Sequence, residues 1–215
     1  MQLARGGKPW ILTSITFFLL FLIGSVFTRE NVQFFFSLLS FFIGIISILL
    51  LVFFRDPKRT IGDGIVAAAD GIIRNVCEVT DEDIGKAWCI STFMNIYHVH
   101  VNRMPIKGTI KTVTYIPGSH LPAFTKESER NERVVFLVET IFGLVKIVLI
   151  AGTLARRIVP YVKKNDKINK GEKISLIRLG SRVDVYLPKK MNITINVKKK
   201  DRVKAGVSQL GTSNV

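Results

Sequence analysis

Two long uncharged segments at the start of the chain limit most strongly what it can fold into. Residues 10–28 are nineteen positions without a charge, and residues 32–54 are twenty-three more. A helix needs roughly 20 apolar residues to cross the hydrocarbon core of a bilayer, and both segments come near or exceed that length. So few residues separate them that we expect a tight hairpin of two transmembrane helices, forming an anchor over residues 1–54. A cleaved signal peptide fits poorly, because a second apolar segment follows at once.

Basic residues predict the orientation of this hairpin. They flank both of its outer ends, at Arg5, Lys8, Arg55, Lys58 and Arg59. In the connecting turn, Arg29 is offset by Glu30. Because basic flanks stay on the cytoplasmic side, we expect residues 55–215 to form a cytoplasmic domain anchored to the plasma membrane.

The charge of the chain is concentrated in that second part. The net charge is +15, and residues 1–54 contribute +2 (three basic residues and one acidic), so +13 remains for residues 55–215. Such a field favours polyanions or an anionic membrane surface. A chain inserted in lipid already has an anionic surface beside it, so we expect membrane or lipid phosphate as the partner rather than nucleic acid.

The texture changes after residue 60 to short apolar runs broken by Gly, Pro, Asn and Asp. The runs that are typical of strands cover residues 65–67, 72–73, 90–93, 99–101, 109–115, 134–138, 145–150 and 183–187. Residues 151–158 could form a short helix. The pattern predicts a mainly β domain with few short helices, either a barrel or a sandwich.

An internal repeat supports this fold class. Residues 164–171 recur as residues 199–206, both with an Asp, a basic residue, an aliphatic residue and, after two more, a Gly. The pattern is similar to a turn of biotinyl- and lipoyl-type barrels, in which Asp and Gly close a hairpin. We therefore expect two related lipoyl-like hairpins.

The pair Gly180-Ser181 is the segment with the most reactive chemistry, although such pairs are usually simple turns. The Ser181 hydroxyl could attack the Gly180 carbonyl and convert the amide to an ester. Elimination at Ser181 would then give dehydroalanine, which hydrolyses to a pyruvoyl group. This reaction needs a base for the hydroxyl and donors for the oxyanion.

Few residues could supply that base. His98 and His100 alternate, so on a strand they would share one face with Asn102. The two histidines could be half of a metal site, but no further ligand cluster accompanies them, and we expect no metal. Cys77 and Cys89 have no metal-ligand spacing either, and we expect them to be reduced thiols.

Asp70 is the acidic residue that we add to the candidates for chemistry, although it lies far from Ser181 in the sequence. Asp70-Gly71 stands between aliphatic residues, which by itself indicates a hairpin turn.

Eight short segments in series resemble one enzyme family. They are Phe53-Phe54-Arg55-Asp56-Pro57-x-Arg59, Ala69-Asp70-Gly71, Phe93-Met94, His100-Val101-Asn102-Arg103-x-Pro105, Tyr115-x-Pro117-Gly118, Ser128-x-x-Asn131-Glu132-Arg133, Ile150-Ala151-Gly152-x-x-Ala155-Arg156-Arg157-Ile158 and Leu179-Gly180-Ser181-Arg182-Val183-Asp184. Their order resembles the phosphatidylserine decarboxylase family in its short, membrane-anchored form.

The resemblance implies a self-processing proenzyme. Cleavage between Gly180 and Ser181 would give chains 1–180 and 181–215, which stay associated, and Ser181 would become the pyruvoyl group. Asp70 would orient His100, and His100 would activate the Ser181 hydroxyl, as in a serine protease.

The mature reaction would be decarboxylation of the serine head group of a phospholipid. The pyruvoyl group derived from Ser181 would form a Schiff base with the substrate amine and act as the electron sink. His100 is the candidate that reprotonates the carbon. Arg103, Arg156 and Arg157 are the candidates for binding the phosphate or carboxylate of the substrate, and His98 is a further substrate-binding candidate.

Departures from the family pattern and some alternatives remain open. Position 98 is His where short relatives commonly carry Asp, which leaves the roles of His98 and His100 open. The lipid tail could be diacyl (phosphatidylserine) or ether-linked (archaetidylserine), and a homo-oligomer is neither indicated nor excluded. A non-enzymatic membrane-anchored lipoyl-like scaffold or adaptor, or a pyruvoyl decarboxylase acting on a soluble amine, are the competing interpretations.

Overall fold

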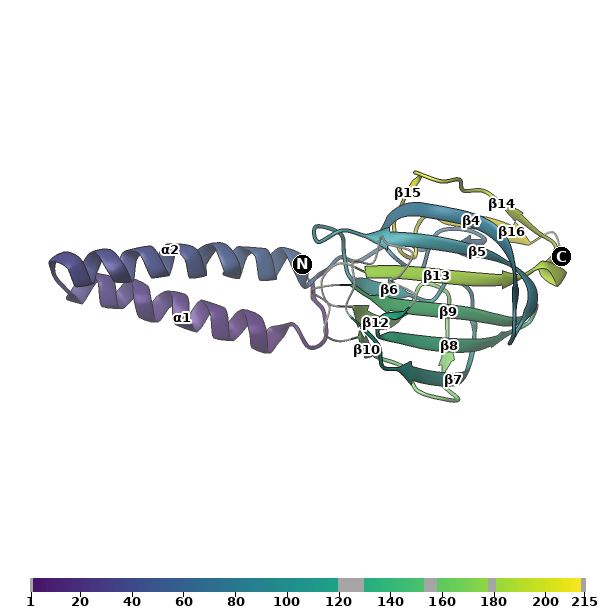
Figure 1. The fold of residues 1–215 in the computed structure, drawn as a ribbon, viewed down its shortest axis with the longest axis horizontal. Helices are drawn as coiled ribbons and strands as arrows, with labels where there is room; N and C mark the ends of the chain where they lie inside the picture. The colour runs from purple at the N-terminus through teal and green to yellow at the C-terminus, as the bar shows by residue number, and fades with distance from the viewer. Residues whose placement is uncertain (1, 120–129, 153–157, 178–180, 214–215) are drawn as a thin grey trace. The chain divides into compact units, whose positions relative to one another are not determined.

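The computed structural model describes residues 2–119, 130–152, 158–177 and 181–213. The chain divides into two compact units, Met1–Lys58 and Arg59–Val215. Figure 1 shows the helices of the first unit and the strands of the second.

The first unit is a pair of apolar helices. Helix α1 spans Lys8–Phe27 and helix α2 spans Glu30–Phe53, with mean hydropathies of 2.2 and 2.8. Strands β1 (Gln2–Leu3) and β2 (Arg55–Asp56) pair antiparallel at the open end of the hairpin. In each helix only 11% of the most apolar window is buried. Helices of this length and composition can cross a membrane, and their exposed apolar surface suits lipid better than water.

The second unit is built almost entirely of strands, and the predicted mainly β fold is confirmed. Its strands are β3 (Ile65–Val66), β4 (Gly71–Asp81), β5 (Gly85–Met94), β6 (Val101–Arg103), β7 (Gly108–Ile116), β8 (Arg133–Thr140), β9 (Gly143–Ala151), β10 (Ile158–Pro160), β11 (Lys167–Ile168), β12 (Lys173–Ile177), β13 (Ser181–Pro188), β14 (Ile193–Ile195), β15 (Arg202–Val203) and β16 (Gln209–Ser213). One short 3-10 helix, η2, spans Lys189–Met191. Both end residues of the helix expected over residues 151–158 belong to strands: Ala151 ends β9 and Ile158 begins β10. Residues 153–157 lie outside the described part.

The strands form one large sheet and two small ones. The large sheet has eight strands in the order β11-β7-β8-β9-β13-β5-β4-β15, and the small sheets are β10-β12-β6 and β14-β16-β3. Figure 1 shows the long strands side by side, with β13 between β9 and β5. The central position of β13 gives its first residue, Ser181, a neighbour on each side.

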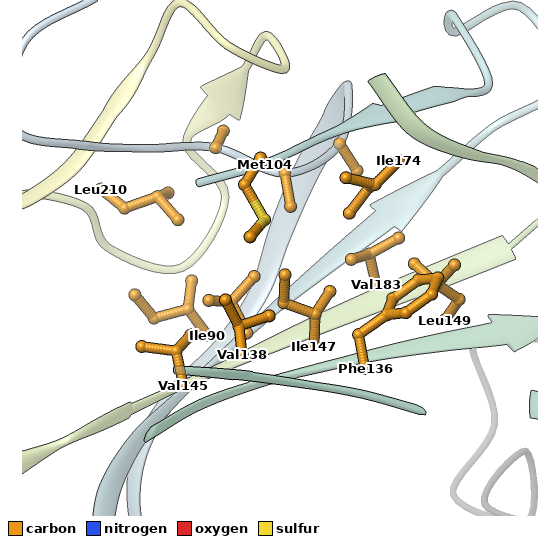
Figure 2. Packing of buried hydrophobic residues seen from close by; sticks show 14 of the residues in the cluster. Ile90, Met104, Phe136, Val138, Val145, Ile147, Leu149, Ile174, Val183 and Leu210 are labelled. Atoms are coloured by element: carbon orange, nitrogen blue, oxygen red, sulfur yellow. The ribbon is translucent and has the colours of Figure 1, made fainter. Parts of the chain in front are cut away.

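Side chains alternate between the two faces of the large sheet. Phe136, Leu149 and Val183 belong to the buried core, and Figure 2 shows them on the same side as Ile174 of β12. The residues that alternate with these core residues along β8, β9 and β13 line a hollow of about 540 Å³ on the opposite face, where Arg133 and Arg182 also lie. This period of two residues fixes which side chains of each strand face the interior.

The internal repeat forms two turns of the same geometry. Asp166 accepts a hydrogen bond from the Lys163 N–H at 2.9 Å, and Asp201 accepts one from the Lys198 N–H at 2.9 Å. The closing glycines match as well, with φ of +80° at Gly171 and +74° in the second copy. The two turns lead into β11 and β15, the strands at the two ends of the large sheet. The repeat thus terminates both ends of the sheet in the same way.

The ends of five long strands meet at one end of the large sheet, which we call the Ser181 rim. It comprises Gly71 at the start of β4, Met94 at the end of β5, Ser181 at the start of β13, Ala151 at the end of β9 and Arg133 at the start of β8. Antiparallel pairing brings these positions together although they are far apart in sequence.

Candidate active site

Ser181 is a fully buried hydroxyl at the rim. It pairs with Met94 on one side and Ala151 on the other, and its exposed fraction is 0%. Among the described residues, the hydrogen-bond partner of its hydroxyl is the Met94 sulfur, with Oγ and Sδ 3.8 Å apart. A thioether is a weak acceptor, and a buried hydroxyl without a good partner costs stability. Such a group is a candidate for chemistry rather than for packing.

His100 is equally buried and lies close to the chain that leads to Ser181. Its carbonyl accepts the Ile177 N–H at 3.2 Å, and Ile177 is the last residue of β12. From Ile177 to Ser181 the chain makes four Cα–Cα steps, which span at most about 15 Å. Gly180, the other residue of the predicted cleavage site, lies outside the described residues.

The hydrogen bond of His100 determines which ring nitrogen can act as a base. Its Nδ1 lies 2.8 Å from the carbonyl oxygen of His98. A carbonyl only accepts, so Nδ1 must carry the proton. In the neutral ring the lone pair is then on Nε2, which is the tautomer that a general base requires.

His98 is occupied by a turn, and the expectation that it shares a strand face with His100 and Asn102 is wrong. Strand β6 begins only at Val101. The His98 N–H donates to the Asn95 carbonyl at 2.9 Å, and the Asn95 N–H donates to His98 Nδ1 at 2.9 Å. These two bonds close a turn after β5, which prevents the chain from becoming extended before residue 99.

Asp70 is held in a buried cluster with Arg59. The guanidinium donates to both carboxylate oxygens, at 2.5 and 2.7 Å, and both side chains are about nine-tenths buried. The Ala205 N–H also donates to Asp70 at 2.7 Å, and Arg59 donates to the Ala205 carbonyl at 2.7 Å. Asp70 immediately precedes the rim residue Gly71 and is thus fixed at the rim by three donors.

The arginines predicted to bind anions are only partly described. Arg103 is 7% exposed and donates from Nη1 to the Gly171 carbonyl at 2.9 Å, a contact that holds a repeat turn. Its assignment to substrate stays a prediction. Arg156 and Arg157 lie outside the described residues.

Metal binding and thiol chemistry find little support among the described residues. Among the described residues, no group of three or more His, Cys, Asp or Glu side chains is arranged to hold a metal ion. Cys77 and Cys89 are free. Burial, followed by the charge of Asp184, raises the pKa of the Cys89 thiol to about 12, so this thiol stays protonated and unreactive at neutral pH.

Comparison with known proteins identifies the family. The family model described as phosphatidylserine decarboxylase matches residues 46–211. A Streptomyces griseus protein named phosphatidylserine decarboxylase proenzyme is 40% identical over 198 residues, which are 92% of this chain and 88% of the relative. The chain belongs to the phosphatidylserine decarboxylase family.

Archaeal relatives of this family are as similar. A Methanosarcina barkeri protein is 39% identical over 214 residues, 98% of each chain, and a Methanococcoides burtonii protein is 41% identical over 208 residues, 95% of this chain and 93% of the relative. Both are named, provisionally, as archaetidylserine decarboxylase proenzymes. The expectation of a decarboxylase proenzyme is thereby confirmed against a non-enzymatic scaffold.

For a phosphatidylserine decarboxylase family member, two residues at the rim had no predicted role. Arg59 belongs to the segment that follows the second helix, and its pairing with Asp70 has no sequence signal beyond its place in that segment. Glu132 belongs to the Asn131-Glu132-Arg133 segment and is 6% exposed. An acidic residue directly before an apolar strand is the signal that could have singled it out.

Removing Arg59 is expected to destabilise the strand-rich unit strongly. In Arg59→Met the Asp70 carboxylate stays buried without its cation, which typically costs about 3–5 kcal/mol. Thermal unfolding of the purified chain in detergent measures the effect. The matched control is Lys111→Met, which removes an exposed pair with Glu139 and is expected to cost at most about 1 kcal/mol. Equal losses in the two variants would show that the Arg59–Asp70 pair has no special role.

Proposed function

We propose that this chain cuts itself between Gly180 and Ser181 and then decarboxylates the serine head group of a membrane phospholipid. The observation that carries the proposal is the buried Ser181 hydroxyl, whose only partner among the described residues is a weak one. The family to which the chain belongs, and the proenzyme names of its relatives, support the same conclusion.

Self-cleavage begins at the Ser181 hydroxyl. His100, with its lone pair on Nε2, takes the hydroxyl proton, and the oxygen attacks the Gly180 carbonyl. The C–O bond forms, the C–N bond breaks, and the proton held by His100 passes to the released nitrogen. His100 then removes the α-proton of residue 181, the ester leaves as the carboxylate of Gly180, and hydrolysis of the dehydroalanine releases ammonia and leaves a pyruvoyl group.

The surroundings of Ser181 fit a small uncharged keto group. Its neighbours across the sheet are Met94 and Ala151, and Val183 follows on the same inward face. The pyruvoyl group would supply an electron sink for the electron pair left when CO₂ departs. These apolar neighbours exclude water, which protects that electron pair from a stray proton.

The remaining residues hold the reacting groups in place. The His98 carbonyl orients the His100 ring, and His100 would return a proton to the reacting carbon. Asp70, predicted to orient His100, is held at the rim by Arg59 and Ala205, the latter in the small chain 181–215. Arg103, Arg156 and Arg157 stay the candidates for the phosphate and carboxylate of the substrate.

The domain would work on the cytoplasmic side of the plasma membrane. Arg5 before α1, Lys8 as its first residue and Arg55 after α2 support this orientation by the positive-inside rule. The net charge of +13 on residues 55–215 suits an anionic membrane surface, where the lipid substrate resides.

The unmodified protein is expected to consist of two chains after self-cleavage. Mass spectrometry of the membrane-extracted protein should give a small chain of residues 181–215 whose first residue carries a ketone in place of the serine amine. Purified protein should release CO₂ from vesicles that contain phosphatidylserine or its ether-linked archaeal counterpart, and the two lipids decide the tail preference. An active preparation that remains one chain of unmodified sequence would rule out the pyruvoyl mechanism.

A further inference from the structure

Glu132 is a buried carboxylate at the Ser181 rim that none of the steps above uses. It lies directly before β8 and is 6% exposed. Its carboxylate oxygen Oε1 has no hydrogen-bond partner within the described part of the chain. A buried carboxylate with an unsatisfied oxygen is costly, so its presence at the rim calls for a partner that the described part of the chain does not supply.

The sheet register places Glu132 on the same inward face as Ser181. Arg133 lines the outer hollow and Val134 lies in the core, so the same alternation directs the buried Glu132 side chain inward. Its carbonyl accepts the Ala151 N–H at 2.9 Å, and Ala151 pairs with Ser181 on its other side. Glu132 and Ser181 are therefore two strand spacings apart, roughly 10 Å between backbones.

The neighbours of these two side chains are small and held in place. Ala151, the residue between them, has only a methyl group. Asn131 donates from its side chain to the Ala151 carbonyl at 2.8 Å and accepts from the Ser119 hydroxyl at 3.0 Å. This frame fixes the backbone on which Glu132 stands.

The chemistry of the proposed substrate identifies what this carboxylate binds. A serine head group carries a phosphate, a carboxylate and an ammonium, and only the ammonium is attracted to Glu132. The amine must reach the carbonyl carbon of residue 181 as an uncharged group with a free lone pair. A carboxylate two strand spacings away, with only Ala151 between, can hold the ammonium and then take one of its protons.

We propose that Glu132 binds the ammonium of the lipid head group and accepts the proton that it loses before reaction. The ammonium becomes a neutral amine and the Glu132 carboxylate becomes the acid, so charge and protons balance. The inference rests on the proposed function, because it assumes a substrate amine that reacts at residue 181. It assigns recognition of the amine to the large chain 1–180.

The test compares Glu132→Gln with Glu139→Gln in the full-length membrane protein. Glu139 lies on β8, the strand that Glu132 precedes, but is exposed and pairs with Lys111, so it controls for the loss of one carboxylate. Both variants are expected to cleave and to carry the ketone, measured by mass spectrometry. In Glu132→Gln, kcat/KM for phosphatidylserine should fall roughly 10- to 100-fold, the loss expected for a charge-assisted hydrogen bond, while Glu139→Gln stays near the unmodified protein.

An inhibitor pair separates amine recognition from a general structural defect. Phosphatidylethanolamine carries the ammonium, and phosphatidylpropanol has the same shape without it. The unmodified protein should be inhibited more strongly by the ethanolamine lipid, and Glu132→Gln should lose that preference while its inhibition by the propanol lipid is unchanged. A variant that cleaves and keeps both its turnover and its preference would overturn the inference.

A second variant keeps the test decisive if the glutamine variant fails to fold. Glu132→Asp retains the charge on a shorter side chain and should cleave, keep the ethanolamine preference and show an intermediate kcat/KM. Loss of cleavage in both variants would assign Glu132 to folding or to the cut, and the inference would be wrong. If the unmodified protein itself has no ketone, the proposed function fails instead, so the two failures are distinguishable.

Discussion

Ser181→Ala is expected to give a single uncleaved chain of 24.2 kDa that has no decarboxylase activity. Alanine removes the hydroxyl that attacks Gly180, and it also removes the atoms from which the pyruvoyl group forms. The loss should therefore be complete rather than partial, because both the cut and the electron sink depend on this one side chain. Gel electrophoresis and intact-mass measurement detect the uncleaved chain, and CO₂ release from lipid vesicles measures the activity.

The substitution should not disturb the fold. Ser181 contacts Met94 through a sulfur 3.8 Å away, and alanine fits the same space without a buried hydroxyl. Thermal unfolding of Ser181→Ala should thus resemble that of the unmodified protein. Ser181→Cys and Ser181→Thr keep a nucleophile and are expected to cleave more slowly than serine. Two chains from a well-folded Ser181→Ala protein would place the cut elsewhere.

The long strands could be predicted because burial leaves a mark on their sequence. Residues 134–138 are an apolar run, and residues 145–150 and 183–187 are apolar except for Lys146 and Asp184; each lies within an observed strand, β8, β9 or β13. Short strands such as β11 and β15 have two residues each and carry no such run. Only the repeat of Asp and Gly around them indicated their turns.

The local structure around the histidines could not be predicted from alternation. His98 and His100 alternate as strand residues do, but a turn forms because the His98 ring accepts the Asn95 N–H. That bond depends on ring orientation, which a pattern of residue types does not contain.

Long-range partners were equally hidden. Asp70 meets Arg59, 11 positions away, and Ala205, 135 positions away. Nothing in the sequence near Asp70 indicates either contact. Likewise, only the strand pairing, which places Ala151 between Glu132 and Ser181, relates these two residues.

These contacts bear on how the two chains stay together after the cut. Asp70 and Arg59 belong to the large chain, and both bond to Ala205 of the small chain. Strand β13 keeps its ladders to β5 and β9, both in the large chain. Cleavage before Ser181 removes one peptide bond and none of these hydrogen bonds, so the two chains are expected to remain associated.

His100→Ala is expected to block self-cleavage almost completely, whereas His98→Asn should leave it largely intact. The His100 ring is buried and has its Nδ1 proton bound by the His98 carbonyl, which leaves Nε2 as the base. Removing a general base typically slows a reaction by roughly 10²- to 10⁴-fold. In His98→Asn the side-chain oxygen can still accept a hydrogen bond in the turn, and the backbone carbonyl that orients His100 is unchanged.

The two histidine variants separate the cut from the later turnover. The fraction cleaved is followed by gel electrophoresis over time, and CO₂ release is normalised to the cleaved fraction. Because the same ring is expected to act as the base in the cut and, once protonated, as the acid that returns a proton to carbon, His100→Ala should be slow in both measurements. A variant that cleaves normally but does not turn over would restrict His100 to decarboxylation. Another base would then have to serve the cut at Ser181. Normal values in both measurements would remove His100 from the mechanism and return His98 as the candidate.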